Sequence, residues 1–153
     1  MLKTGSIILS IWSGLNLFLA FLILILIIFL DTDAPILVMV FEESESAGLD
    51  ARAISAVNCL AILYNSCAAA LSVLALYVTW SSLINGQRKA FWLLLVTIGF
   101  VQILAFVAWA AVGNARWQVN AVLSALYIVG IGLAGFAIFK RQAHTIKLRG
   151  TLK

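Results

Sequence analysis

The sequence lacks ionisable residues wherever it is strongly apolar, and it has a single histidine. All six carboxylates fall between positions 31 and 50, and the histidine, His144, is close to the C-terminus. Proton relays and ion-coupled carriers place such residues inside the membrane, and general bases are most often histidines or carboxylates. Haem and zinc sites draw on the same side chains. These absences argue against an enzyme, an ion-coupled carrier, and a metal or cofactor site within the apolar segments.

The chain has two cysteines, Cys59 and Cys67, which lie eight positions apart in one apolar segment. On a helix they would be about 12 Å apart along the axis, which is too far for a disulfide. Their spacing also differs from the CxxC motif of thiol oxidoreductases. We therefore predict that both are small packing residues.

The chain as a whole has few charged residues. Hydrophobic residues make up 64% of the 153 residues and charged residues 10%, whereas a soluble domain has about 45–50% and about 25%. No water-soluble fold of this length can bury so much apolar surface, so the solvent of this chain is the lipid bilayer. The net charge of +4 reflects the excess of Lys and Arg at cytoplasmic ends of membrane helices. It does not indicate a nucleic-acid partner.

Four apolar segments are long enough to cross the roughly 30 Å hydrocarbon core. We predict one all-α domain over 1–153, with spans over 7–30, 54–84, 91–112 and 117–139. The first span is expected to be retained, because its apolar run is longer than the about 7–15 residues of a signal-peptide core. Short connections between the last three spans predict an antiparallel meander, with the first helix closing a four-helix bundle.

Charge is segregated between the two faces of this bundle. An acidic loop, 31–50, separates the first two spans, and a basic tail, 140–153, follows the last one. Because cytoplasmic ends collect Lys and Arg, we predict that both termini are cytoplasmic and that the acidic loop is outside. The charge bias and the absence of an N-x-S/T acceptor favour a bacterial inner membrane. The cations of the inner face are Lys3, Arg88, Lys89, Lys140, Arg141, Lys147, Arg149 and Lys153.

Two local signals mark the ends of the second helix. Asp50 directly precedes its apolar pattern, and an aspartate at this position accepts hydrogen bonds from free backbone N–H groups of the first turn. We predict that Asp50 is the N-cap. At the other end, residues 85–87 read Asn-Gly-Gln, which predicts a turn.

The second span contains the clearest pattern, a seam of small and polar residues at alternating steps of three and four. Helices in lipid associate through close backbone approach at small residues and through polar side chains. The seam is therefore predicted to be the centre of the bundle or an interface with another protein. Its positions are Asn58, Ala61, Asn65, Ala68, Ser72, Ala75, Thr79 and Ser82.

Four amides could form a polar cluster in the outer half of the bundle, where the second and fourth helices begin and the third ends. They are Asn58, Asn65, Gln102 and Asn120. Such a cluster would serve either as a pocket for a ligand or only as interhelical hydrogen bonding, which contributes about 0.6 kcal/mol per pair. The sequence leaves both interpretations open.

The acidic loop offers a further candidate surface at Glu42, Glu43 and Glu45. Hard cations favour carboxylate ligands, but the loop has no spaced ligand motif with a positioned glycine. A solvated loop that sets topology, or a docking surface, is the favoured interpretation.

Two functions agree with these observations. The favoured hypothesis is a non-enzymatic accessory or scaffold subunit, without a cofactor, that associates with a membrane-protein partner or with further copies of itself through the second-helix seam. The alternative is a protein that binds or carries a lipid or other apolar ligand in a cavity of the bundle. The sequence contains no family motif that would decide between these two functions.

Overall fold

The computed structural model describes residues 1–29, 50–112 and 117–150, and these residues are almost entirely helical. The described helices are α1 (Leu2–Phe29), α4 (Ala51–Val78), which continues as the π-helical segment η1 (Thr79–Leu83), α5 (Arg88–Val112) and α6 (Trp117–Gly150). Four of the described helices are long and apolar enough to cross a membrane. The predicted all-helical membrane fold is therefore confirmed at this level.

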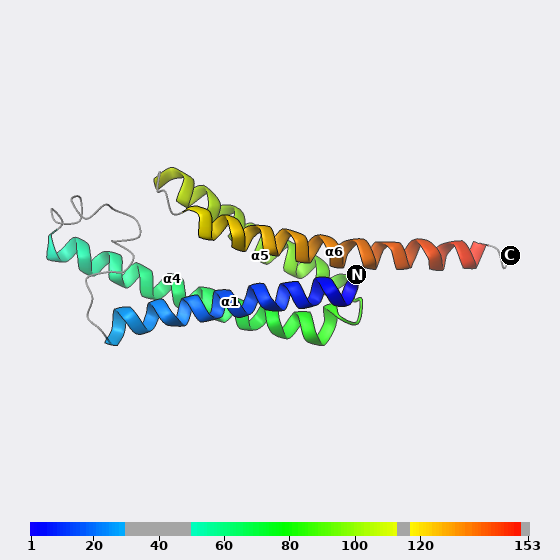
Figure 1. Cartoon of the computed structure of the whole chain (residues 1–153), viewed down its shortest axis with the longest axis horizontal. Coiled ribbons are helices and arrows are strands. Elements are labelled where there is room, and N and C mark those ends of the chain that lie inside the picture. The colour runs from blue at the N-terminus through cyan, green and yellow to red at the C-terminus, as the bar shows by residue number, and fades with distance from the viewer. Residues whose placement is uncertain (30–49, 113–116, 151–153) are drawn as a thin grey trace.

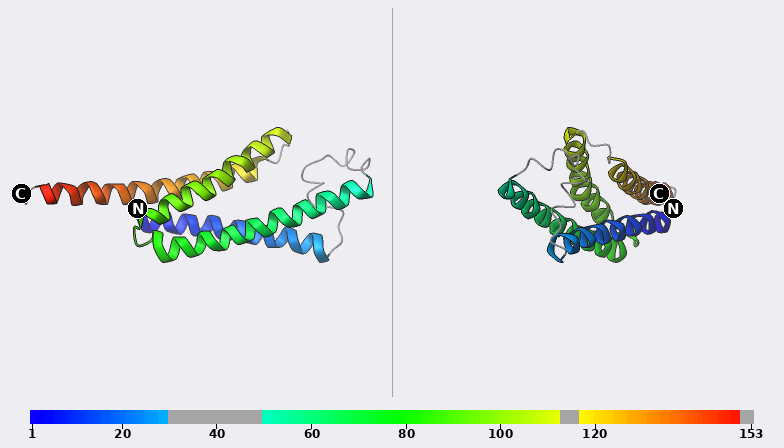
Figure 2. Two further views of the ribbon diagram at one scale, coloured as in Figure 1. Left: turned by 180° about the vertical axis from the view of Figure 1, so that it is seen from behind. Right: turned by 60° about the vertical axis from the view of Figure 1, so that its left-hand side comes forward.

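The helices are arranged around α1, which packs along both α4 and α6 (Figure 1). Helix α5 packs mainly on α6, and it meets α4 and η1 only near the turn that joins them. From that turn the α5–α6 pair diverges from the α1–α4 pair (Figure 2). The first helix thus lies between α4 and α6, which are the second and fourth spans of the chain.

Close approach of α1 and α6 explains this central position. A Cβ atom at Gly5 would lie 2.8 Å from both the backbone nitrogen of Ala134 and the carbonyl oxygen of Gly130. Such distances leave no room for a side chain, so the two backbones touch at this glycine. Helices in lipid gain van der Waals contact by this kind of approach.

The core is concentrated at the turn end, which we define as the end of the bundle that holds the N-terminus and residues 84–87 (Figure 1). All the helices contribute buried apolar side chains there, including Leu9, Leu83, Leu94 and Ile138. The opposite end, where α1 finishes and α4 begins, is called the loop end. Between Gly99 and Val107, α5 has no buried residue.

The second helix has its predicted cap and its predicted turn. Asp50 caps α4 as predicted, with its carboxylate accepting from the Ala53 backbone nitrogen at 2.7 Å. The turn is present, and Gly86 has a φ of 78°, which a residue without a Cβ adopts at little cost. Cys59 and Cys67 are free and both are exposed, so neither of these predicted packing residues is buried within the described part of the chain.

Two features of the helices were not foreseen. The second helix changes to π geometry at Thr79, whose carbonyl oxygen accepts from the Ile84 backbone nitrogen at 3.0 Å. Helix α6 continues through most of the basic tail to Gly150 and extends past the turn end (Figure 1). Lys, Arg, Gln, Ala and Leu are good helix formers, which explains why the helix does not stop at the membrane boundary.

Candidate functional site

The second-helix seam lies inside the chain. Its residues Ala61, Asn65, Ser72, Ala75 and Thr79 are buried, and Asn58, Ala68 and Ser82 are partly buried. Helix α4 has α1 as its main neighbour. These small residues therefore hold α4 against α1, and they leave little of the seam available to a partner.

The buried hydroxyl groups of α1 and of the seam have few hydrogen bonds. Ser6, Ser13 and Thr79 are almost fully buried, and within the described residues their hydroxyl oxygens have no hydrogen-bond partner. Ser72 donates to the carbonyl oxygen of Ala68 in its own helix at 2.8 Å. Small size, which permits close approach, thus matters more at these positions than polarity does.

Several other polar side chains of the spans donate hydrogen bonds within their own helix. Asn65 donates to the Ala61 carbonyl oxygen at 2.8 Å, Asn16 to that of Trp12 at 2.9 Å, and Thr97 to that of Leu93 at 2.6 Å. Each of these bonds spans four positions, so none of them joins two helices.

Hydrogen bonds between side chains of one helix and groups of another occur between α5 and α6. Ser124 donates to the Gln102 side-chain oxygen at 3.0 Å. The Tyr127 hydroxyl donates to the Leu94 carbonyl oxygen at 2.9 Å, and the Trp12 ring lies 5.4 Å from the Tyr127 ring, centre to centre. Polar contacts thus join α5 to α6, whereas α1 is held by close packing.

A groove of about 950 Å³ lies between these two helices. Its walls come from positions 95–107 of α5 and 121–131 of α6, and they are apolar except for Gln102, Ser124 and Tyr127. All of these positions belong to segments long and apolar enough to span a membrane. The volume lies within the range of about 300–1,000 Å³ that is usual for ligand pockets.

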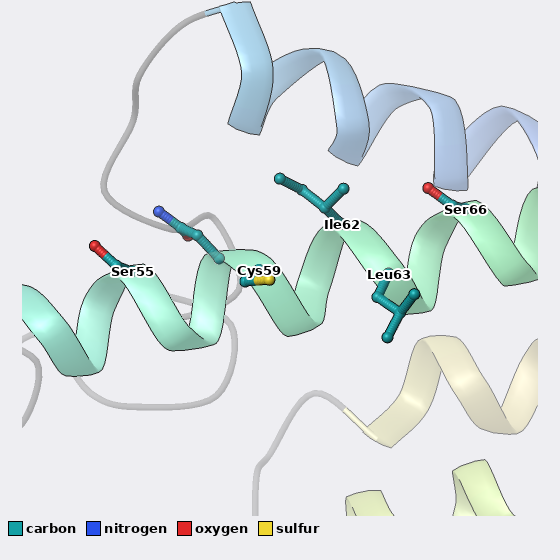
Figure 3. A pocket seen from close by; sticks show the side chains of 6 residues that line it. Ser55, Cys59, Ile62, Leu63 and Ser66 are labelled. Atoms are coloured by element: carbon teal, nitrogen blue, oxygen red, sulfur yellow. The ribbon is translucent and has the colours of Figure 1, made fainter.

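A second, shallower hollow of about 490 Å³ lies on α4 near the loop end. Figure 3 shows Ile62 and Leu63 pointing to different sides of the helix. Asn58 also lines this hollow, and its side-chain oxygen is buried with no partner among the described residues. Because α4 alone supplies the described lining, this hollow is a weaker candidate than the groove.

The four amides of the predicted cluster belong to different parts of the chain. Asn58 and Asn65 are on α4, and Gln102 contacts Ser124 in the α5–α6 groove. No described hydrogen bond links the α4 pair to Gln102. The side chain of Asn120 and the acidic surface of Glu42, Glu43 and Glu45 lie outside the described part of the chain.

Sequence reasoning named Gln102 but missed its partner Ser124, and it also missed Tyr127, which bonds the Leu94 carbonyl oxygen. Ser124 and Tyr127 are isolated polar residues on an apolar helix, and a helical reading of α5 alone does not reveal them. A signal was present: Ser124 and Tyr127 are three positions apart, so they share one face of α6. Among the described residues, no three His, Cys, Asp or Glu side chains come together as a metal site.

Comparison of the chain with protein-family models, with curated proteins and with solved structures finds no match.

Proposed function

We propose that the chain is a non-enzymatic accessory or scaffold subunit of a bacterial inner membrane. In this proposal the helices form an antiparallel bundle with both termini on the cytoplasmic side. The segregated charges support that orientation. Paired contacts support opposite directions for neighbouring helices, because higher positions on one helix meet lower positions on the other. The pairs are Gly5 with Ala134 and Leu9 with Gly130 for α1 and α6, and Leu94 with Tyr127 and Gln102 with Ser124 for α5 and α6.

The partner is proposed to be a transmembrane helix that seats in the α5–α6 groove. The observation that carries this proposal is the Gln102–Ser124 pair in the wall of an apolar groove at membrane depth. Lipid tails offer no hydrogen-bonding groups, whereas a neighbouring helix offers both polar side chains and close packing. The helix would come from a membrane-protein partner or from a second copy of this chain.

Site-specific photocrosslinking in the native membrane tests this proposal. A crosslinking residue at Ile103, which is exposed and lines the groove, should form a protein adduct of defined mass. Gln102→Leu should weaken that adduct several-fold, because it removes the polar contact that orients the helix. The matched control is Leu104, which is exposed but does not line the groove, and it should yield lipid adducts. Equal protein adducts at both positions, or purification from mild detergent as a lone monomer, would contradict the proposal.

A second function, binding of a lipid or other apolar ligand, is favoured by the volume of the same groove. An apolar cavity with a few polar groups in its wall is the usual form of a small-molecule site. Native mass spectrometry separates the two functions. A lipid that is retained by the unmodified chain and lost in Gln102→Leu would favour the ligand-binding function. A chain that retains no lipid would rule that function out.

The proposed orientation has its own test. In a Cys59→Ser, Cys67→Ser background, a cysteine at Ser46 should react with an impermeant reagent added outside intact cells, because the acidic loop is proposed to be outside. The two native cysteines are removed since both are exposed. A cysteine in place of Lys89, exposed at the turn end, is the control and should react only after the membrane is opened. The reverse pattern would show that the bundle is inverted.

A further inference from the structure

Five cations gather at the turn end of the bundle: Lys3 from α1, Arg88 and Lys89 from α5, and Lys140 and Arg141 from α6. All are exposed, and a guanidinium nitrogen of Arg141 lies 3.6 Å from the position of a Cβ on Gly86. Among the described residues the one carboxylate side chain is Asp50, which caps α4 at the loop end. The turn end therefore carries a concentrated positive charge, at the opposite end of the bundle from this carboxylate.

Two of these cations are held against aromatic rings. The Arg88 guanidinium lies 5.1 Å from the centre of the Phe139 ring, and the Lys140 ammonium lies 5.9 Å from that of Phe136. Phe139 also packs edge-on against Phe91 at 5.7 Å. Cations within about 6 Å of an aromatic face are attracted to it, so these two charges are kept next to apolar side chains at the edge of the spanning segments.

The aromatic side chains below these cations face the lipid. Phe136, Phe139 and Trp92 are 55%, 39% and 49% exposed, and tryptophan is typical of the boundary between headgroups and hydrocarbon. A molecule that binds here must therefore be negatively charged at one end and apolar at the other.

We propose that Arg88 and Lys140 form a site for the headgroup phosphate of an anionic phospholipid, whose acyl chains lie on Trp92, Phe136 and Phe139. Arginine binds phosphate oxygens in a bidentate manner and lysine binds as a point charge. Basic pockets between spanning helices on the cytoplasmic side are known to take anionic headgroups. The site is separate from the α5–α6 groove, and it does not depend on the accessory role.

The test compares charge-removing variants in nanodiscs of phosphatidylcholine that contain a minority of phosphatidylglycerol. Native mass spectrometry should show that phosphatidylglycerol is retained preferentially by the unmodified chain. Arg88→Gln and Lys140→Gln should each weaken phosphatidylglycerol retention about fivefold, because each removes the attraction of one cation to an anionic headgroup. The double variant should weaken retention about 25-fold. Arg88→Lys, which keeps the charge, should lose less than Arg88→Gln.

Lys3→Gln and Lys89→Gln are the matched controls, because each removes one exposed cation of the same end that has no aromatic contact among the described residues. Both should retain phosphatidylglycerol. If all four single variants lose it equally, binding follows net charge and the site is overturned. Inorganic phosphate should not compete; full competition would show that the residues recognise free phosphate and not a lipid.

Discussion

Gly5→Ala should lower the free energy of unfolding by about 1–3 kcal/mol, the usual cost of overpacking a tight contact. The added methyl group would lie 2.8 Å from backbone atoms of α6 at Gly130 and Ala134. Backbone atoms cannot rotate away as a side chain does, so α1 and α6 must separate. Because α1 also holds α4, the separation should weaken the whole bundle. Thermal unfolding in detergent, or unfolding forces in a bilayer, would measure it.

Gly14→Ala and Gly132→Ala are the matched controls on the same two helices. A Cβ at either position meets no atom within 4 Å, and alanine favours a helix over glycine by up to about 1 kcal/mol. Both controls should therefore be neutral or stabilising. A Gly5→Ala chain as stable as these controls would show that α1 and α6 do not touch at Gly5.

The sequence predicted the class of fold because that class follows from composition and length. Runs of apolar residues long enough to cross the bilayer must be helical, since lipid cannot satisfy backbone N–H and C=O groups. The Asp50 cap and the Gly86 turn were predictable for a similar reason, because each depends on a few adjacent residues. Local signals of this kind do not require knowledge of the neighbours.

The packing of α1 on α6 was not predictable residue by residue in the same way. It depends on a contact between Gly5 and the stretch that contains Gly130 and Ala134, which are far apart in the chain. Small residues occur on every span, and the pattern on one helix does not say which other helix it meets. The proposed amide cluster shows the same difficulty, because Asn65 bonds its own helix and Gln102 bonds Ser124.

Tyr127→Ala should be the most destabilising substitution on α6, with a loss of about 3 kcal/mol. This value is at the lower end of the usual range for truncating a buried aromatic side chain. We expect the lower end because, in lipid, burying an apolar side chain gains less free energy than it does in water. Tyr127 is only 4% exposed. It joins three helices, through its hydroxyl to the Leu94 carbonyl on α5 and through its ring to Trp12 on α1.

Tyr127→Phe separates these two contributions. It keeps the ring and removes the hydrogen bond, so it should cost only about 1 kcal/mol. Val129→Ala, at an exposed position of the same helix, should change stability by less than about 0.5 kcal/mol.

A double-mutant cycle of Trp12→Ala with Tyr127→Ala should give a coupling of about 0.5–1.5 kcal/mol, as expected for an aromatic pair. If Tyr127→Phe cost as much as Tyr127→Ala, the hydroxyl and not the ring would hold α6 to its neighbours. The hydrogen bond to the Leu94 carbonyl oxygen would then contribute more to stability than the packing of the ring against Trp12.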